Sequence, residues 1–177
     1  MTIYNFSAGP ACLPDPVLRA AGESAKEYKS SGISILEMSH RSGPIVSLFE
    51  EASQNIRALL SIPSNYKILW LQGGASSQFA MIPMNLLPEG GTADYMDTGA
   101  WSFKAITECN KTGTGNVIGS SKESTYSYIP KDIKQSIDSK YLHITSNNTI
   151  YGTQYKEYPK VDNPDGFLVA DMSSDIL

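Results

Sequence analysis

The sequence predicts an α/β protein in which a mostly parallel sheet is flanked by helices. From residue 68 onward, short apolar runs alternate with stretches of helical periodicity, which is the pattern of strand–helix crossover units. Loops rich in Gly, Ser or Asn follow several of these runs. The apolar run at residues 167–170 ends in one carboxylate, Asp171, at the end of a buried strand where α/β sheets bind ligands.

The first part of the chain is predicted to be mainly helical. Residues 5–16 form a turn-rich opening, and residues 17–28 carry apolar side chains at helical spacing. Residues 33–38 are short and alternating, which indicates a strand or an extended segment. A second helix is predicted over residues 45–60, where apolar residues recur every three or four positions.

The rest of the chain alternates between strands and helices. Strands are predicted at residues 68–71, 93–96, 116–118, 141–144 and 166–170. Helices are predicted at residues 79–87 and 101–111, with a short one at 131–137 and a polar surface connection at 119–128. The last strand is followed by only a few residues, so we expect the chain to be a fragment or one piece of a divided protein.

Composition restricts the class of protein. The net charge is -4 and the pI about 5.1, without clustered Lys or Arg, which argues against nucleic acid or a membrane as the main partner. Cys12 and Cys109 are isolated, which indicates neither a disulfide framework nor a zinc site and suits a reducing compartment. The N-terminus lacks signal-peptide features and no run is long enough to span a bilayer, so the predicted location is cytoplasmic.

A Gly-rich segment at residues 72–78 lies between a predicted strand and a predicted helix. Small residues there, Ala75 and Ser76 among them, let backbone N–H groups and the helix N-terminus approach an anion. The segment matches neither a GxGxxG fingerprint nor a Walker loop. It is therefore either a phosphate cradle or a plain turn with Ser as the helix N-cap.

Three further residues follow the ends of predicted strands. Trp101 could lie flat against an aromatic ligand, although a lone Trp more often packs in a core. Thr149 could bind a ring hydroxyl or a phosphate, although turn chemistry explains the Asn and Gly beside it. Asp171 could hold a pyridine nitrogen protonated, or could cap the next turn. Together with residues 75 and 76, these positions describe a pocket for a phosphorylated pyridine.

Other polar residues give weaker indications. His40 and Arg41 form a compact cationic pair in a loop, and the planar guanidinium suits a carboxylate or phosphate, although a solvated surface Arg is common. His143, inside a predicted strand, is expected to be a satisfied core histidine rather than a general base. We find no metal-ligand spacing and no Ser/His/Asp arrangement.

Over essentially its whole length, the chain resembles the N-terminal half of enzymes of the phosphoserine aminotransferase family. These are pyridoxal-phosphate enzymes of class V and fold type I. Each matching segment is weak alone, but their order is specific. They are residues 5–11 (NFSAGPA), 37–41 (EMSHR), 63–67 (PSNYK), 72–74 (QGG), 78–79 (QF), 93–95 (ADY), 98–102 (TGAWS), 148–150 (NTI) and 171–174 (DMSS).

The resemblance implies the architecture and a role for each site residue. It implies the fold type I large domain, a mixed, mostly parallel seven-stranded sheet, with residues 16–177 as its first part and residues 1–15 contributing to the small domain or a dimer contact. Ala75 and Ser76 would contact the phosphate of pyridoxal 5'-phosphate through their backbone. The other implied roles are stacking on the ring for Trp101, a bond to the phenolic oxygen for Thr149, a bond to the ring nitrogen for Asp171, and substrate binding for His40 and Arg41.

The resemblance also implies the reaction. The family transfers an amino group between L-glutamate and 3-phosphohydroxypyruvate, giving 2-oxoglutarate and O-phospho-L-serine in serine biosynthesis, and acts as a homodimer. Its Schiff-base lysine lies in sequence that follows this segment, and Lys160, the last lysine here, matches no such motif. We therefore expect an inactive segment that needs the C-terminal half. The alternatives are another fold type I enzyme, such as a desulfurase, or a non-catalytic phosphate-ligand-binding module.

Overall fold

The computed structural model describes residues 3–177, which form two compact units. The first unit comprises residues 3–70 together with Leu177, and the second comprises residues 71–176. Each unit is described by itself. The domain boundary expected after residue 15 remains a prediction.

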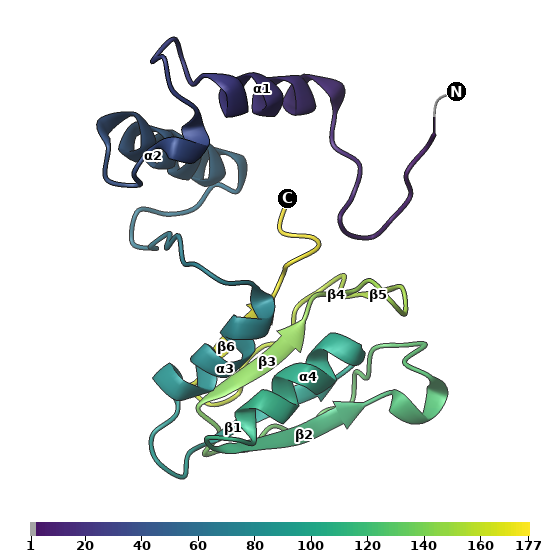
Figure 1. Ribbon diagram of the computed structural model, residues 1–177. Coiled ribbons are helices and arrows are strands. Elements are labelled where there is room, and N and C mark those ends of the chain that lie inside the picture. The colour runs from purple at the N-terminus through teal and green to yellow at the C-terminus, as the bar shows by residue number, and fades with distance from the viewer. Residues whose placement is uncertain (1–2) are drawn as a thin grey trace. The chain divides into compact units, whose positions relative to one another are not determined.

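The first unit contains two helices joined by the longer connection of residues 27–42 (Figure 1). Helix α1 (Asp15–Lys26) has Pro in its first turn, where the missing N–H costs nothing, and helix α2 (Gly43–Leu59) begins in the same way. Both helices were predicted from their periodicity and are confirmed. Each helix begins two residues earlier than the apolar pattern alone indicates.

The segment predicted as strand or extended forms a short 3₁₀ helix, η1 (Ile35–Glu37). Ser34 Oγ accepts a hydrogen bond from the Leu36 N–H (3.1 Å), and the Glu37 carboxylate accepts one from the Ser34 N–H (3.0 Å). This reciprocal capping satisfies backbone donors within the turn. Local side-chain bonding therefore outweighs the alternating pattern that indicated a strand.

The strand predicted at residues 68–71 is wrong, because this segment makes no strand pairing in the structure. Leu69 is 73% exposed. Trp70 is held instead by α2, where its indole N–H donates to Ser53 Oγ (2.9 Å) and its ring lies 5.8 Å from that of Phe49. An apolar run forms a strand only when a neighbouring strand accepts its hydrogen bonds.

The second unit is an α/β layer built on a four-stranded parallel sheet, with strand order β2-β1-β3-β6 (Figure 1). This confirms the predicted fold class. The described residues contain four strands of this sheet, whereas the family's large domain is expected to have seven. The elements are α3 (Ala75–Leu86), β1 (Thr92–Asp97), α4 (Ala100–Cys109), β2 (Thr114–Ser120), η2 (Lys122–Ser124), β3 (Tyr141–Thr145), β4 (Asn147–Asn148), β5 (Thr153–Gln154) and β6 (Phe167–Asp171).

The two faces of the sheet have different coverings. Helices α3 and α4 lie against one face, where Phe79 and Ile106 pack on Tyr95 and Tyr141. Leu142 belongs to the opposite face, which loop residues cover. Because side chains alternate along a strand, every second residue of β1 and β3 faces the helices. This alternation places His143 and Thr145 on the helix-covered face together with Tyr141.

The short helix predicted at residues 131–137 is also wrong, because this segment is an irregular loop. The buried Asp94 carboxylate accepts hydrogen bonds from the Ser136 N–H (2.7 Å) and from Ser136 Oγ (2.8 Å). Such side-chain bonds compete with helical ones. The antiparallel pair β4–β5 has no counterpart in the prediction.

None of the helices within residues 3–177 combines the length and the apolar character needed to cross a bilayer.

Candidate functional site

Three of the predicted site residues lie at the same edge of the sheet. Trp101 is the second residue of α4, directly after β1, while Thr149 follows β3 and β4, and Asp171 is the last residue of β6. Strands β1, β3 and β6 are parallel, so their carboxyl ends meet at one edge, where α/β sheets bind ligands. Thr145, at the end of β3, pairs directly with Asp171.

Trp101 and Thr149 are in contact. The indole Nε1–H of Trp101 donates to Thr149 Oγ1 at 3.4 Å, although the two residues lie 48 positions apart in sequence. Trp101 is 38% exposed, so it is not buried in the core that residues 3–177 form. An indole held at its nitrogen and open elsewhere can offer a ring face to a flat ligand.

The loop that carries Thr149 is fixed against the start of α4. Asn148 Nδ2 donates to Thr98 Oγ1 (3.2 Å), and both residues are fully buried. The N–H groups of Thr98 and Gly99 both donate to Ser102 Oγ at 2.9 Å. A Cβ at Gly99 would overlap the Asn148 side-chain oxygen, so this close approach requires glycine. These contacts therefore hold the loop that carries Thr149 close to the start of α4, where Trp101 lies.

Helix α3 begins with the predicted anion cradle. Gly73 has φ +91°, and a Cβ there would lie 3.0 Å from Ser77 Oγ, so the turn requires glycine. The N-cap is Gly74, without a side-chain cap, and not Ser as the plain-turn alternative assumed. The N–H groups of Ala75 and Ser76 belong to the first turn, which has no intrahelical partners. This helix N-terminus can receive an anion.

A lysine that we did not predict lies beside this cradle. Lys104 Nζ donates to Ser76 Oγ at 2.8 Å and lies 5.9 Å from the centre of the Trp101 ring. The contact brings a positive charge to the first turn of α3. Lys104 lies three residues after Trp101, on the same side of α4. This spacing could have indicated from the sequence that Lys104 lies near the site.

Asp171 both caps a turn and retains a free oxygen. Its Oδ1 accepts from the Ser173 N–H (3.1 Å) and from Ser173 Oγ (2.5 Å), which agrees with the turn-capping alternative. Among residues 3–177, no hydrogen bond is made to Oδ2. One carboxylate oxygen is therefore oriented by the turn, while the other can bind a cationic ligand group.

His143 is buried but not satisfied, so the expectation of a satisfied core histidine is wrong in that respect. Its ring stacks on Tyr95 with centroids 4.9 Å apart, and the Phe79 ring edge lies 6.3 Å away. Neither ring nitrogen has a hydrogen-bond partner in the described part of the chain. Burial lowers the pKa of the imidazole to about 4, and the charge of Asp171 acts in the opposite direction, which raises this pKa. The side chain is thus neutral at pH 7.

The depressed pKa of His143 predicts acid sensitivity. The unfolded chain binds a proton below about pH 6.5 that the folded protein excludes until about pH 4. The contribution of His143 to the free energy of unfolding is therefore fully present above pH 6.5. It falls by about 3 kcal/mol as the pH decreases toward 4. Urea unfolding at pH 7 and pH 4 measures the loss. His143→Phe should remove this part of the pH dependence, and an unchanged dependence would contradict the assignment.

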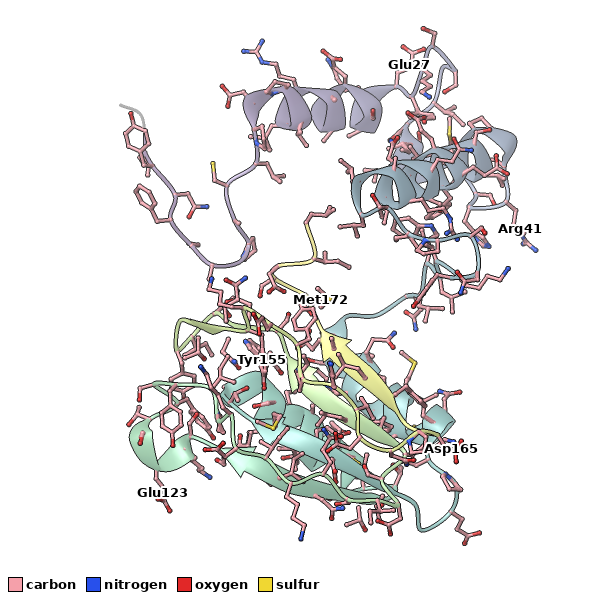
Figure 2. The ribbon with its side chains drawn as sticks, turned by 180° about the vertical axis from the view of Figure 1, so that it is seen from behind. Glu27, Arg41, Glu123, Tyr155, Asp165 and Met172 are labelled. Atoms are coloured by element: carbon pink, nitrogen blue, oxygen red, sulfur yellow. The ribbon has the colours of Figure 1, made fainter. Side chains whose placement is uncertain are left out.

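The predicted substrate residues lie in the first unit. His40 and Arg41 are exposed in the loop before α2, and the Arg41 N–H donates to Ser39 Oγ at 3.2 Å (Figure 2). Among the described residues, the Arg41 guanidinium makes neither a hydrogen bond nor an ion pair. Their role in binding substrate remains a prediction.

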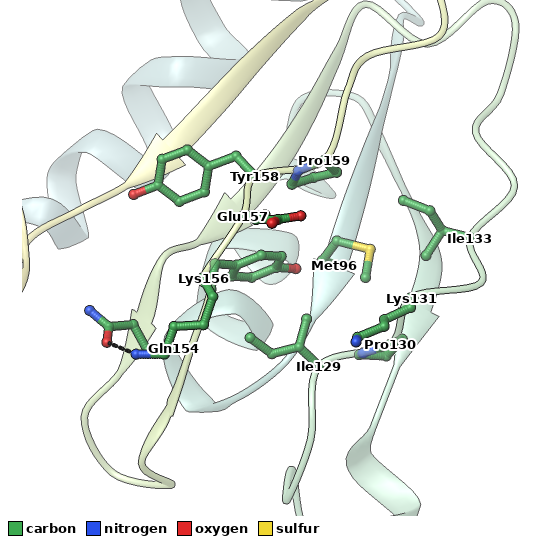
Figure 3. Close-up of a pocket in the computed structure, with 11 residues that line it drawn as sticks. Met96, Ile129, Pro130, Lys131, Ile133, Gln154, Lys156, Glu157, Tyr158 and Pro159 are labelled. Atoms are coloured by element: carbon green, nitrogen blue, oxygen red, sulfur yellow. Dashed lines mark hydrogen bonds between the residues drawn. The ribbon is translucent and has the colours of Figure 1, made fainter.

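A separate cavity of about 540 Å³ lies beside β1 in the second unit, between two loops (Figure 3). It contains none of the predicted site residues. Burial raises the pKa of the Tyr155 phenol at its wall, and the Tyr155 hydroxyl has no partner in residues 3–177. Its lining residues are Met96, Ile129, Pro130, Lys131, Ile133, Gln154, Tyr155, Lys156, Glu157, Tyr158 and Pro159.

Residues 3–177 contain no group of three or more His, Cys, Asp or Glu side chains placed to hold a metal ion.

Comparison with known proteins gives consistent matches over the whole chain. The family model for class-V aminotransferases matches residues 3–177. The phosphoserine aminotransferase of Geobacillus kaustophilus is 51% identical over 176 residues, which cover 98% of this chain and 48% of that protein. The chain spans about half the length of the curated relatives that it matches.

Solved structures match equally well. A phosphoserine aminotransferase studied for radiation damage of its Schiff base superposes with a TM-score of 0.93 at 45% identity, covering 99% of this chain and 49% of that one. The pyridoxal-phosphate-bound phosphoserine aminotransferase of Trichomonas vaginalis gives a TM-score of 0.85 at 36% identity, covering 96% of this chain and 47% of that one. The fold is therefore that of half of these enzymes.

Proposed function

Because this chain belongs to the class-V aminotransferase family, we propose that the sheet edge described above binds pyridoxal 5'-phosphate and that the complete protein is a phosphoserine aminotransferase. The observation that carries this proposal is the contact between Trp101 and Thr149 at the edge where β6 ends in Asp171. A stacking ring, a hydroxyl and an acid at one edge suit a pyridine that bears a phenolic oxygen.

The donor set fits each part of the cofactor. The uncapped first turn of α3 and the Lys104 ammonium suit the phosphate. The Trp101 ring suits the pyridine face, and the Thr149 hydroxyl suits the phenolic oxygen. The free oxygen of Asp171 suits a protonated ring nitrogen. Open α/β sheets bind such ligands at the carboxyl ends of their strands.

Each residue then has a defined task in amino-group transfer. The bound cofactor supplies an electron sink for the substrate's α-carbon. Asp171 holds the proton on the ring nitrogen, while Trp101 excludes water from one ring face. The α3 N-terminus holds the phosphate in place. His40 and Arg41 bind the carboxylate or phosphate of the substrate, for which the planar guanidinium is suited.

The proposed reaction converts L-glutamate and 3-phosphohydroxypyruvate into 2-oxoglutarate and O-phospho-L-serine, as a step of serine biosynthesis. The names of the relatives and their identity near 50% support this substrate choice. The Schiff-base lysine that the family uses has no counterpart among residues 1–177. We therefore expect residues 1–177 alone to be inactive and the C-terminal half to complete the site.

A homodimer and a cytoplasmic location belong to the same proposal. Ile3, Tyr4 and Phe6 are 86%, 77% and 93% exposed, so the N-terminal segment offers apolar surface to a partner subunit or domain. Cys12 and Cys109 are both free thiols, which suits a reducing compartment. Sedimentation equilibrium of the complete protein measures the oligomeric state.

The direct test is an assay of the complete protein with O-phospho-L-serine and 2-oxoglutarate, measuring glutamate formation. We expect turnover with phosphoserine and little with alanine or cysteine, because the loop at His40 and Arg41 favours a doubly anionic substrate. A preference for alanine would support a different aminotransferase, and sulfide release from cysteine would support a desulfurase. Either outcome would overturn the substrate assignment.

Stacking on Trp101 predicts a specific loss of affinity. Trp101→Leu in the complete protein should weaken binding of pyridoxal 5'-phosphate roughly 10-fold, since ring stacking contributes about 0.5–1.5 kcal/mol beyond buried area. Trp101→Phe keeps a ring face and should lose less. Equilibrium dialysis of the cofactor measures both variants. Equal affinities for Leu and Phe would show that the indole does not stack on the ring.

A further inference from the structure

We propose that Tyr126 is a positioning residue, which packs on Tyr151 and so holds the turn of residues 148–152 against the end of β1. The turn carries Thr149, whose hydroxyl is proposed above to bind the phenolic oxygen of the cofactor. This tyrosine pair thus keeps that hydroxyl beside the Trp101 indole. The inference rests on the proposed function of Thr149, although the tyrosine pair itself can be tested without the cofactor.

The Tyr126 side chain is anchored at the end of β1. Tyr126 is 7% exposed, and its hydroxyl donates to Asp97 Oδ2 at 3.3 Å. Asp97 is the last residue of β1, and Ser120 Oγ at the end of β2 donates to the same oxygen at 3.0 Å. Burial, followed by the charge of Asp97, raises the pKa of the Tyr126 phenol to about 12, so the hydroxyl is a donor at neutral pH. The ring is therefore fixed relative to the strand that leads to Trp101.

The backbone at Tyr126 adopts a conformation that large side chains disfavour. Thr125 and Tyr126 have φ +53° and +54°, in the left-handed region that β-branched and aromatic residues rarely adopt. The Tyr126 N–H donates to the Ser121 carbonyl at 2.9 Å, which closes this turn. Such strain persists where surrounding contacts require it, often near functional sites. The contacts of Tyr126 with Asp97 and Tyr151 offset the strain here.

The Tyr126 ring packs on the turn that carries Thr149. Its centre lies 4.8 Å from that of the Tyr151 ring, and the two ring planes are tilted by 58°. The N–H groups of Tyr151 and Gly152 both donate to the Asn148 carbonyl, at 3.2 and 2.8 Å. Because Thr149 lies inside this hydrogen-bonded turn, a shift of the Tyr151 ring is transmitted to the Thr149 hydroxyl.

The turn has an anchor on each side of Thr149. Before it, Asn148 Nδ2 donates to Thr98 Oγ1 at 3.2 Å. After it, the tyrosine pair holds the turn. The bond from the Trp101 indole to Thr149 Oγ1 is 3.4 Å long, which is longer than most N–H···O bonds, so it orients the hydroxyl only weakly. Without the tyrosine pair one anchor is left, and we expect the hydroxyl to lose its fixed direction.

The test with cofactor compares the affinity of the complete apoprotein for pyridoxal 5'-phosphate with that for its 3-deoxy analogue, which lacks the phenolic oxygen. The ratio of the two dissociation constants reports the contact of that oxygen with the Thr149 hydroxyl. Tyr151→Leu should reduce the preference for the natural cofactor about 5-fold, as expected when one ordinary hydrogen bond is lost. Tyr151→Phe keeps the ring and should retain the preference.

A double variant and a matched control make this test specific. Adding Tyr151→Leu to Thr149→Val should cause no further loss, because both changes remove the same contact. Tyr158 forms a comparable pair with Tyr155 in the same unit, with ring centres 6.4 Å apart, at the cavity that contains none of the predicted site residues. Tyr158→Leu should leave the ratio unchanged. A ratio that Tyr151→Leu does not alter, or that Tyr158→Leu lowers equally, would overturn the proposal.

A measurement on the complete apoprotein tests the tyrosine pair independently of the cofactor. The ¹H–¹⁵N signal of the Trp101 indole, assigned with Trp101→Phe, reports its bond to Thr149. Tyr126→Leu and Tyr151→Leu should both shift this signal and leave that of Trp70, which lies in the other unit, in place. A Trp101 signal that Tyr151→Leu leaves unmoved would overturn the positioning role even if Tyr126→Leu fails to fold. The expected shifts in a protein that binds no cofactor would contradict the proposed function alone.

Discussion

Asp171→Asn should lower the kcat of the complete protein for amino-group transfer by about 10²- to 10³-fold, the usual cost of removing one preorganised electrostatic contact. Asn preserves the size of the side chain and an oxygen that can accept from Ser173. It removes the negative charge, so the ring nitrogen of the cofactor loses the partner that keeps it protonated. Steady-state kinetics with phosphoserine measures the effect.

Asp175 provides a matched control for this substitution. Its carboxylate accepts hydrogen bonds from Ser146 Oγ (2.5 Å) and Gln154 Nε2 (3.1 Å), so it lies near the same edge but is engaged by protein groups. Asp175→Asn should therefore change kcat only a few-fold. If both substitutions reduced kcat equally, Asp171 would have no special role.

Gly99→Ala should reduce both stability and cofactor affinity. The added Cβ would overlap the Asn148 side-chain oxygen, so Asn148 must move and its hydrogen bond to Thr98 must break. Overpacking of this kind costs about 1–3 kcal/mol in the free energy of unfolding. Because Thr149 is the next residue after Asn148, its hydroxyl should shift and the complete protein should bind pyridoxal 5'-phosphate more weakly.

Gly22→Ala is the matched control, since a Cβ at this position in α1 meets nothing within 4 Å. It should stabilise the protein by roughly 0.5–1 kcal/mol, as Ala does relative to Gly within a helix. Urea unfolding of both variants and cofactor titration of both give the comparison. A Gly99→Ala protein as stable as the parent would show that the loop carrying Asn148 can move freely.

The sheet could be predicted from the sequence because its strands are apolar runs with near neighbours along the chain. Strands β1, β3 and β6 fall where the apolar runs were found, and α2, α3 and α4 follow the helical periodicity. Segments 33–38, 68–71 and 131–137 were wrong for a different reason. The structure of each segment depends on a specific side-chain contact, which a local sequence pattern does not reveal. Examples are the hydrogen bond from the Ser34 N–H to the Glu37 carboxylate and the one from the Ser136 N–H to the Asp94 carboxylate.

Only part of the candidate site could be predicted from the sequence. Trp101, Thr149 and Asp171 could be identified because each lies at or just after the end of a strand. The pairing of Thr145 with Asp171 depends on the register between β3 and β6, which the sequence does not specify. His143 looked like an ordinary core residue until the structure revealed that neither of its nitrogens has a partner within residues 3–177.

The most direct test of a cofactor site at this sheet edge is the ¹⁵N NMR shift of the ring nitrogen of labelled pyridoxal 5'-phosphate bound to the complete protein. We predict a protonated ring nitrogen at neutral pH, converted to the unprotonated form by Asp171→Asn. An unprotonated nitrogen in the unchanged protein, or a shift that Asp171→Asn leaves unaltered, would contradict the placement of the cofactor against this carboxylate.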